Sequence, residues 1–201
     1  MKKIGIFGGS FDPVHSGHLI LAEQARDGAD LDMIVFIPAK VSPFKCDKDI
    51  LDERHRYEMV NAAIAGNSGF TSSDMELKGP DISYTVITLE NCRKQYGADA
   101  NIYFICGTDA FLGIEKWYKS EDILQNYSLI VGSRPRYKDK ERDLLIERIA
   151  GNYGTDIKKI HMPKIDISST DIKRRIKEGR SIKYLVPAAV EEYINKNRLY
   201  R

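Results

Sequence analysis

Long apolar segments are missing from this sequence of 201 residues, and so is an excess of charge of one sign. Apolar stretches such as residues 33–37 fall far short of the roughly 20 residues that a membrane-spanning helix requires. Lysine and arginine number 31 against 29 for aspartate and glutamate, a net charge of +2 that excludes coating of nucleic acid through bulk charge. We therefore expect neither nucleic acid nor a membrane as a partner. An anionic small molecule must be bound by a local cluster.

Cysteine is also scarce. Cys46, Cys92 and Cys106 are odd in number and lack Cys-x-x-Cys spacing, which argues against both a disulfide framework and a structural zinc site. After the first three residues, a four-residue apolar patch ends at Gly8, which is too short for the apolar core of a signal peptide. We therefore expect buried thiols in a cytoplasmic protein.

Apolar segments of strand length alternate with segments of helical period, an alternation typical of a parallel sheet covered by helices. We predict strands at residues 3–7, 33–37, 70–75, 102–106, 129–131 and 159–161. We predict helices at residues 17–26, 52–64, 85–96, 121–125, 140–149, 170–177 and 187–195. No linker rich in glycine, serine or proline divides the chain. The sequence thus predicts a single α/β domain over residues 1–201, a doubly wound, mostly parallel, Rossmann-like sheet with a helical C-terminal annex from about residue 169.

The most informative segment is GGSFDPVHSGH at residues 8–18, between the first predicted strand and the first predicted helix. In a doubly wound sheet, ligands bind at this edge, outside the carboxyl ends of the strands. Gly8 and Gly9 allow the backbone to approach a ligand and to adopt dihedral angles that other residues avoid. A helix that begins near Gly17 directs free N–H groups at the same place, and His15 and His18 add further donors. The segment therefore predicts a phosphate site.

Two other chemistries fit this segment less well. Its glycines lack the G-x-G-x-x-G spacing of a dinucleotide fingerprint, which disfavours a hydride-transfer enzyme. His15 and His18 are suitable zinc ligands by type, but no third ligand with suitable spacing stands nearby. The sequence predicts no metal ion held by the protein itself.

The segment resembles the G-x-F-D-P-x-H-x-G-H signature of the nucleotidyltransferase superfamily. About 150 residues further on, the segment ISSTDIKR at residues 167–174 resembles a second signature of that superfamily. Between them, Ser83-Tyr84-Thr85, the Gly107 to Asp109 segment and Trp117 are similar to the bacterial nicotinate-nucleotide adenylyltransferases, and the similarity covers nearly the whole chain. Phosphopantetheine adenylyltransferases share the first signature but lack the Ser-Tyr-Thr segment.

The resemblance implies transfer of an adenylyl group from ATP to nicotinate mononucleotide, which yields nicotinate adenine dinucleotide and pyrophosphate in NAD biosynthesis. It implies Mg²⁺ as cofactor, held through the ATP phosphates rather than by a cage of carboxylates. The attacking phosphate is already an anion, so the protein has to align the two substrates and stabilise charge.

The implied site residues gather at the two signatures and at the ends of the predicted strands. Those implied for ATP are Gly8, Gly9, Ser10, Phe11, His15, His18, Lys45, Gly107, Asp109, Arg134, Ser168, Ser169, Thr170, Lys173 and Arg174. His15 and His18 are the implied catalytic residues, with His18 nearest the α-phosphate. Those implied for the nicotinate nucleotide are Ser83, Tyr84, Thr85 and Trp117, with the pyridine ring stacked on the indole.

Two positions depart from the family pattern. Lys173 stands where the family usually has arginine, and it offers a point charge instead of a planar fork, which Arg174 could supply. Phe44 stands where the family tends to have histidine, which leaves Lys45 as the cation of that loop.

The residues also allow ordinary roles and rival functions. Trp117 fits a core, a hydroxyl near Thr85 fits a helix cap, Asp109 fits a cap of the next helix, and Lys45 fits a solvated side chain. The rival functions are an adenylyl- or cytidylyltransferase with another acceptor, such as nicotinamide mononucleotide or phosphopantetheine, and a nucleotide-sensing module without turnover. A fragment of a class I aminoacyl-tRNA synthetase is a third, although no KMSKS-like string is present. The oligomeric state is left open, a homo-oligomer included.

Overall fold

A computed structural model describes residues 1–41, 43, 50–80, 82–132, 139–163 and 165–201 of the chain. Within these residues, a six-stranded sheet has the order β3-β2-β1-β4-β5-β6, and every neighbouring pair is parallel. The strands are β1 (Lys3–Gly9), β2 (Met33–Pro38), β3 (Phe70–Ser72), β4 (Asn101–Gly107), β5 (Ser128–Gly132) and β6 (Ile157–Ile160). The strand order reverses between β1 and β4, so the predicted doubly wound sheet is confirmed.

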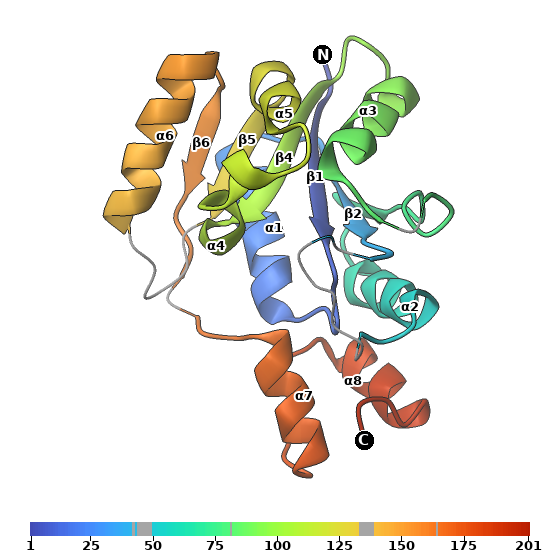
Figure 1. Ribbon diagram of the computed structural model, residues 1–201. Coiled ribbons are helices and arrows are strands. Elements are labelled where there is room, and N and C mark those ends of the chain that lie inside the picture. Colours follow the sequence, from blue (N-terminus) through green and yellow to red (C-terminus); the bar gives the residue numbers. More distant parts are fainter. Residues whose placement is uncertain (42, 44–49, 81, 133–138, 164) are drawn as a thin grey trace.

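Helices cover both faces of the sheet (Figure 1). One apolar core includes residues of α1 (Ser16–Gly28), α2 (Glu53–Ile64), α7 (Ser169–Lys177) and α8 (Ala188–Lys196). The other includes residues of α3 (Thr85–Tyr96), α4 (Thr108–Phe111), α5 (Ser120–Asn126) and α6 (Asp139–Tyr153). Phe7 and Phe36 belong to the first core, whereas Ile6 and Val35 belong to the second. The strands are therefore apolar on both faces, as parallel strands between two helical layers must be.

The predicted elements are confirmed in type and order, with differences at their ends. The third strand is shorter than predicted, because the chain turns after Ser73, where the N–H groups of Leu77 and Lys78 bond to the carbonyl of Asp74. Helix α4 and the 3₁₀ helix Ile114–Lys116 are absent from the prediction. Elements of three or four residues are too short to show a hydrophobic period.

The C-terminal helices lie beside the end of the sheet where β1 stops, and the C-terminus lies there too (Figure 1). Ile172, Val190, Ile194 and Leu199 are buried in the same core as residues of α1 and α2. The predicted annex is therefore anchored by its own apolar residues. No helix in the described ranges is both long and apolar enough to cross a bilayer.

Candidate active site

Within the described part of the chain, two neighbouring cavities open at the carboxyl ends of the strands. The larger, about 970 Å³, lies between the end of β1, the start of α1 and helix α7, and we call it the α7 cavity. The smaller, about 510 Å³, lies between the end of β1, the start of α3 and Trp117, and we call it the α3 cavity. The described residues that line both cavities are Gly8, Gly9, Ser10, Asp109 and Ala110. We call these residues the shared wall. Ligands in the two cavities can meet there.

Gly8 and Gly9 are the last residues of β1 and pair with Ile37 and Pro38 of β2. Neither has a positive φ; in this segment, the left-handed residue is Phe11, with φ of 46°. The expectation that these glycines supply unusual dihedral angles is therefore wrong, because the strand continues through both of them. Their contribution is space. A Cβ at Gly8 would meet no heavy atom nearer than the Phe104 ring, 3.9 Å away, so this strand end stays open to a ligand.

His18 lies in the first turn of α1, and it lines the α7 cavity. Its Nδ1 accepts a hydrogen bond from the backbone N–H of His15 at 3.2 Å. In a neutral imidazole that accepts at Nδ1, the proton is carried by Nε2. The start of the helix thus selects the tautomer whose second nitrogen is a donor, which is the form that a phosphate oxygen requires.

His15 lies directly behind His18. The two rings are stacked with their centroids 3.7 Å apart and their planes 24° from parallel. His15 is only 1% exposed and is not one of the described residues that line either cavity. The structure therefore places His18 at the wall of the α7 cavity and His15 behind its ring, while a contact of either residue with phosphate stays a prediction.

Helix α7 brings the second signature to the same cavity. Ser168 is the N-cap of α7, and its Oγ accepts the Asp171 N–H at 3.2 Å. Its hydroxyl is therefore engaged in capping the first turn of the helix. The Ser169 hydroxyl donates to the carbonyl of Pro13 at 3.0 Å, which ties α7 to the segment after β1. The lining residues from α7 include Ser169, Thr170, Lys173 and Arg174. The first turn of α7 and its free N–H groups therefore face the cavity that His18 lines.

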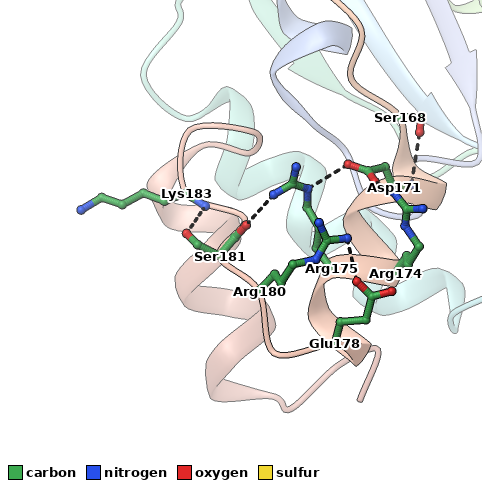
Figure 2. A network of polar contacts seen from close by, with 8 residues as sticks. All are labelled: Ser168, Asp171, Arg174, Arg175, Glu178, Arg180, Ser181 and Lys183. Carbon is green, nitrogen blue, oxygen red and sulfur yellow. Dashed lines mark hydrogen bonds and ion pairs between the residues drawn. The ribbon is translucent and has the colours of Figure 1, made fainter.

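The arginines of α7 are partly neutralised by an acid on the same helix. Arg174 and Arg175 both donate to the carboxylate of Asp171, and Figure 2 shows Arg175 reaching toward Asp171 and Ser181. Hydrogen bonds from Arg175 and Arg174 hold the pKa of Asp171 below its ordinary value, so this carboxylate stays ionised. Lys173 is paired differently: its ammonium donates to Asp12 at 2.8 Å, inside the cavity.

The other predicted ATP residues fall into two groups. Gly107 and Asp109 line the α7 cavity as expected. The alternative role of Asp109 as a helix cap is wrong, because α4 begins at Thr108 with Gly107 as its N-cap. Lys45 and Arg134 lie outside the described residues, as does the departure at Phe44.

The start of α3 forms one wall of the α3 cavity, which Ser83, Tyr84 and Thr85 all line. The N-cap is Tyr84, whose side chain makes no capping hydrogen bond. The Ser83 hydroxyl instead accepts the backbone N–H of Lys40 at 3.0 Å, from the segment that follows β2. A hydroxyl cap at this N-cap position is therefore ruled out, and the partial positive charge of the helix start can act on a carboxylate.

Trp117 directly follows the 3₁₀ helix and lines the α3 cavity. Its ring packs edge-to-face on Phe104 of β4, with centroids 5.7 Å apart, and the residue is half-buried. Tyr118 lines the same cavity and packs against Tyr84 with ring centroids 4.6 Å apart. The only tryptophan of the sequence is therefore at the cavity edge, and its surroundings can accept a flat ring.

Comparison with known proteins shows to which family of the superfamily this chain belongs. Residues 6–175 match the family model described as cytidylyltransferase-like. A curated protein of Thermoanaerobacter sp. (strain X514), named "Probable nicotinate-nucleotide adenylyltransferase", is 39% identical over 199 residues, which cover 99% of this chain and 94% of that protein. The chain belongs to this adenylyltransferase family. The enzyme class predicted from the sequence, a nucleotidyltransferase of NAD biosynthesis, is thereby confirmed.

Solved structures agree with the fold of this adenylyltransferase. Plasmodium falciparum nicotinic acid mononucleotide adenylyltransferase complexed with APC superposes with a TM-score of 0.80 at 20% identity, covering 100% of this chain and 98% of that one. The same Plasmodium protein complexed with NaAD gives a TM-score of 0.79 at 21% identity, with the same coverage. At such identities the likeness confirms the Rossmann-like α/β fold.

Arg56 is a residue of the adenylyltransferase that the motifs do not reveal. It is fully buried on α2 and donates to the backbone carbonyls of Leu51, Ser10, Ala39 and Lys40 at 2.7 to 3.1 Å. These bonds join the segments that follow β1 and β2, and Ser10 belongs to the shared wall. A signal was present: Arg56 is in helical register with the buried residues of α2, Met59, Val60 and Ile64.

Glu76 is a second such residue, and it lines the α3 cavity. Its carboxylate accepts a hydrogen bond from the hydroxyl of Thr88 on α3. Burial raises the pKa of Glu76 above its ordinary value, while the bonds from Thr88 and Ser83 oppose that shift. No local sequence pattern predicts this contact, because it joins α3 to a turn that is 12 residues away in sequence.

Proposed function

We propose that this chain joins ATP and nicotinate mononucleotide with ATP in the α7 cavity and the mononucleotide in the α3 cavity. The observation that carries this placement is the shared wall, because the 5′-phosphate of one substrate must reach the α-phosphorus of the other. The α7 cavity offers N–H donors and cations, which suit a triphosphate. The α3 cavity offers aromatic rings and a helix start, which suit a pyridine ring with a carboxylate.

The reaction forms a bond between the 5′-phosphate oxygen and the α-phosphorus as the bond to pyrophosphate breaks. No proton has to be removed from the attacking group, so positioning and charge stabilisation account for the catalysis. His18 donates a hydrogen bond from its Nε2–H to the α-phosphate, and His15 packs against the other face of that ring. The first turn of α7 and Lys173 hold the β- and γ-phosphates, while Asp109 accepts from a ribose hydroxyl. Lys45 and Arg134 complete the set of cations.

The site suits a Mg²⁺ ion that is held by the ATP phosphates rather than by protein side chains. Among the described residues, no three histidine, cysteine, aspartate or glutamate side chains are grouped so as to hold a metal ion. Mg²⁺ keeps several waters and needs few protein ligands when phosphates are present. Held through the ATP phosphates, the ion would supply positive charge to balance that of the departing pyrophosphate. We also propose that residues 1–201 act as one nucleotidyltransferase domain in the cytoplasm.

Pyrophosphate release tests the proposed function directly. With ATP and Mg²⁺, we expect release with nicotinate mononucleotide and at least tenfold lower kcat/KM with nicotinamide mononucleotide, because the start of α3 favours a negative charge. Phosphopantetheine should give none. CTP in place of ATP is the control for the nucleotide. Release with phosphopantetheine alone would contradict the proposed acceptor, and no release with any acceptor would favour a sensing module.

Replacing Trp117 tests the placement of the acceptor. Trp117→Ala should raise the KM for nicotinate mononucleotide about tenfold, because stacking of flat rings contributes about 0.5–1.5 kcal/mol beyond burial. The KM for ATP should change by less than about twofold, since the indole lines only the α3 cavity. Trp117→Phe is the matched control and should retain most of the affinity. Equal increases for both substrates would assign Trp117 to the core instead.

A further inference from the structure

The last two residues of the chain reach the α7 cavity, which neither signature predicts. Tyr200 and Arg201 both line it. The Tyr200 hydroxyl donates to Oδ1 of Asp12 at 2.7 Å, and the ammonium of Lys173 donates to Oδ2 of the same carboxylate at 2.8 Å. Asp12 of the first signature is thus held between α7 and the C-terminal end of the chain.

Because Asp12 is buried, its carboxylate needs the partners that surround it. Asp12 is 6% exposed, and a buried carboxylate is stable only when it is paired and hydrogen-bonded. Lys173 supplies the opposite charge, and the buried Arg56 adds a second positive charge that interacts with Asp12. Burial and the neighbouring Asp12 charge both raise the pKa of Tyr200, so its hydroxyl stays protonated and remains a donor.

The backbone of the tail directs Tyr200 to this position. Leu199 is buried in the core, and its N–H bonds to the carbonyl of Ile194 at 3.0 Å. On either side of it, Arg198 and Tyr200 have positive φ angles of 53° and 63°. Left-handed conformations are unfavourable for residues with a Cβ and persist only where the surroundings hold them. The tail therefore has a specified path, fixed by the core at Leu199 and by Asp12 at Tyr200.

We propose that Tyr200 is a positioning residue of the ATP site: its hydroxyl fixes the Asp12 carboxylate, which in turn presents the Lys173 ammonium to the β- and γ-phosphates. The inference rests on the proposed placement of ATP in the α7 cavity. A lysine carries its charge on a flexible four-carbon chain and has no planar fork of its own. A fixed carboxylate beside it limits the ammonium to one part of the cavity before ATP arrives, which reduces the ordering required on binding.

The test is Tyr200→Phe, which removes one oxygen and keeps the ring. We expect the dissociation constant for ATP, measured by calorimetry without acceptor, and the KM for ATP to rise about fivefold through the loss of one hydrogen bond. The KM for nicotinate mononucleotide should stay within about twofold. The matched control is Tyr193→Phe on α8, whose hydroxyl lies 3.0 Å from Nδ1 of His55 and which lines neither cavity among the described residues. It should leave both constants unchanged.

Coupling to Lys173 separates positioning from a structural role. In a Lys173→Met background, Tyr200→Phe should not weaken ATP binding further, because the group that it positions is gone. Additive losses, equal changes for both substrates, or a Tyr200→Phe enzyme that matches Tyr193→Phe would each overturn the proposal. A native chain that binds ATP without releasing pyrophosphate would refute the proposed function alone, because these binding measurements need no turnover. A native chain that does not bind ATP would refute both.

Discussion

His18→Ala should lower kcat for adenylyl transfer by about 100-fold or more, the usual cost of removing one donor aimed at a developing charge. His18 lines the α7 cavity, and because its Nδ1 accepts the His15 N–H, a neutral ring carries its proton on Nε2. Since that donor acts most strongly in the transition state, the KM for ATP should change much less than kcat. Steady-state kinetics with both substrates varied measures the two effects separately.

Two amide variants distinguish the catalytic donor from the helix cap. An asparagine amide ends near the position of Nδ1, so His18→Asn can still accept the His15 N–H but offers no donor at the position of Nε2. A glutamine amide reaches further, so His18→Gln can offer that donor. We expect His18→Asn to be as slow as His18→Ala but more stable by about 1 kcal/mol, the usual contribution of a cap. His18→Gln should be the fastest of the three. An unchanged kcat in His18→Ala would remove His18 from the mechanism.

Arg56→Met should lower the free energy of unfolding by about 3–5 kcal/mol, one of the largest effects open to a single substitution here. The methionine fills much of the volume but leaves the carbonyls of Leu51, Ser10, Ala39 and Lys40 without this donor. A buried carbonyl without a partner costs about 1–3 kcal/mol. Because Ser10 belongs to the shared wall, the KM values of both substrates should rise together.

Urea unfolding measures this loss, and Arg54→Met is its control. Arg54 lies on the same helix but is exposed, so its replacement should change stability by no more than about 0.5 kcal/mol. Arg56→Lys should recover only part of the loss, since one ammonium cannot reach carbonyls that a planar guanidinium bonds from three nitrogens. Similar unfolding midpoints for Arg54→Met and Arg56→Met would show that these bonds contribute little.

The features that could be predicted are those that short stretches of chain encode. The strand, glycines and helix at residues 3–28 follow one another directly, so pattern and position together predict a phosphate site at the cavity that the structure shows there. The same holds for Ser169 and Thr170 at the start of α7. Trp117 was placed by resemblance, because base rates alone favour a core position.

The features that were missed depend on residues that meet only after folding. Tyr200 and Asp12 are 188 residues apart, and Arg56 bonds to Ser10 across 46 residues. The dihedral angles of Gly8 and Gly9 were predicted wrongly for a related reason: pairing with β2 keeps both residues in an extended strand. The motifs therefore predicted several groups that line the two cavities, whereas the buried contacts that hold those groups in place required three-dimensional information.

The shared wall has a further consequence once substrates are placed as proposed. The dinucleotide product spans both cavities, so it behaves as a bivalent ligand whose two halves are joined by a very short linker. When one half detaches, the other keeps it at a high effective concentration beside its own cavity, and rebinding competes with escape. The geometry that brings two phosphates together therefore also slows the departure of the molecule that they become.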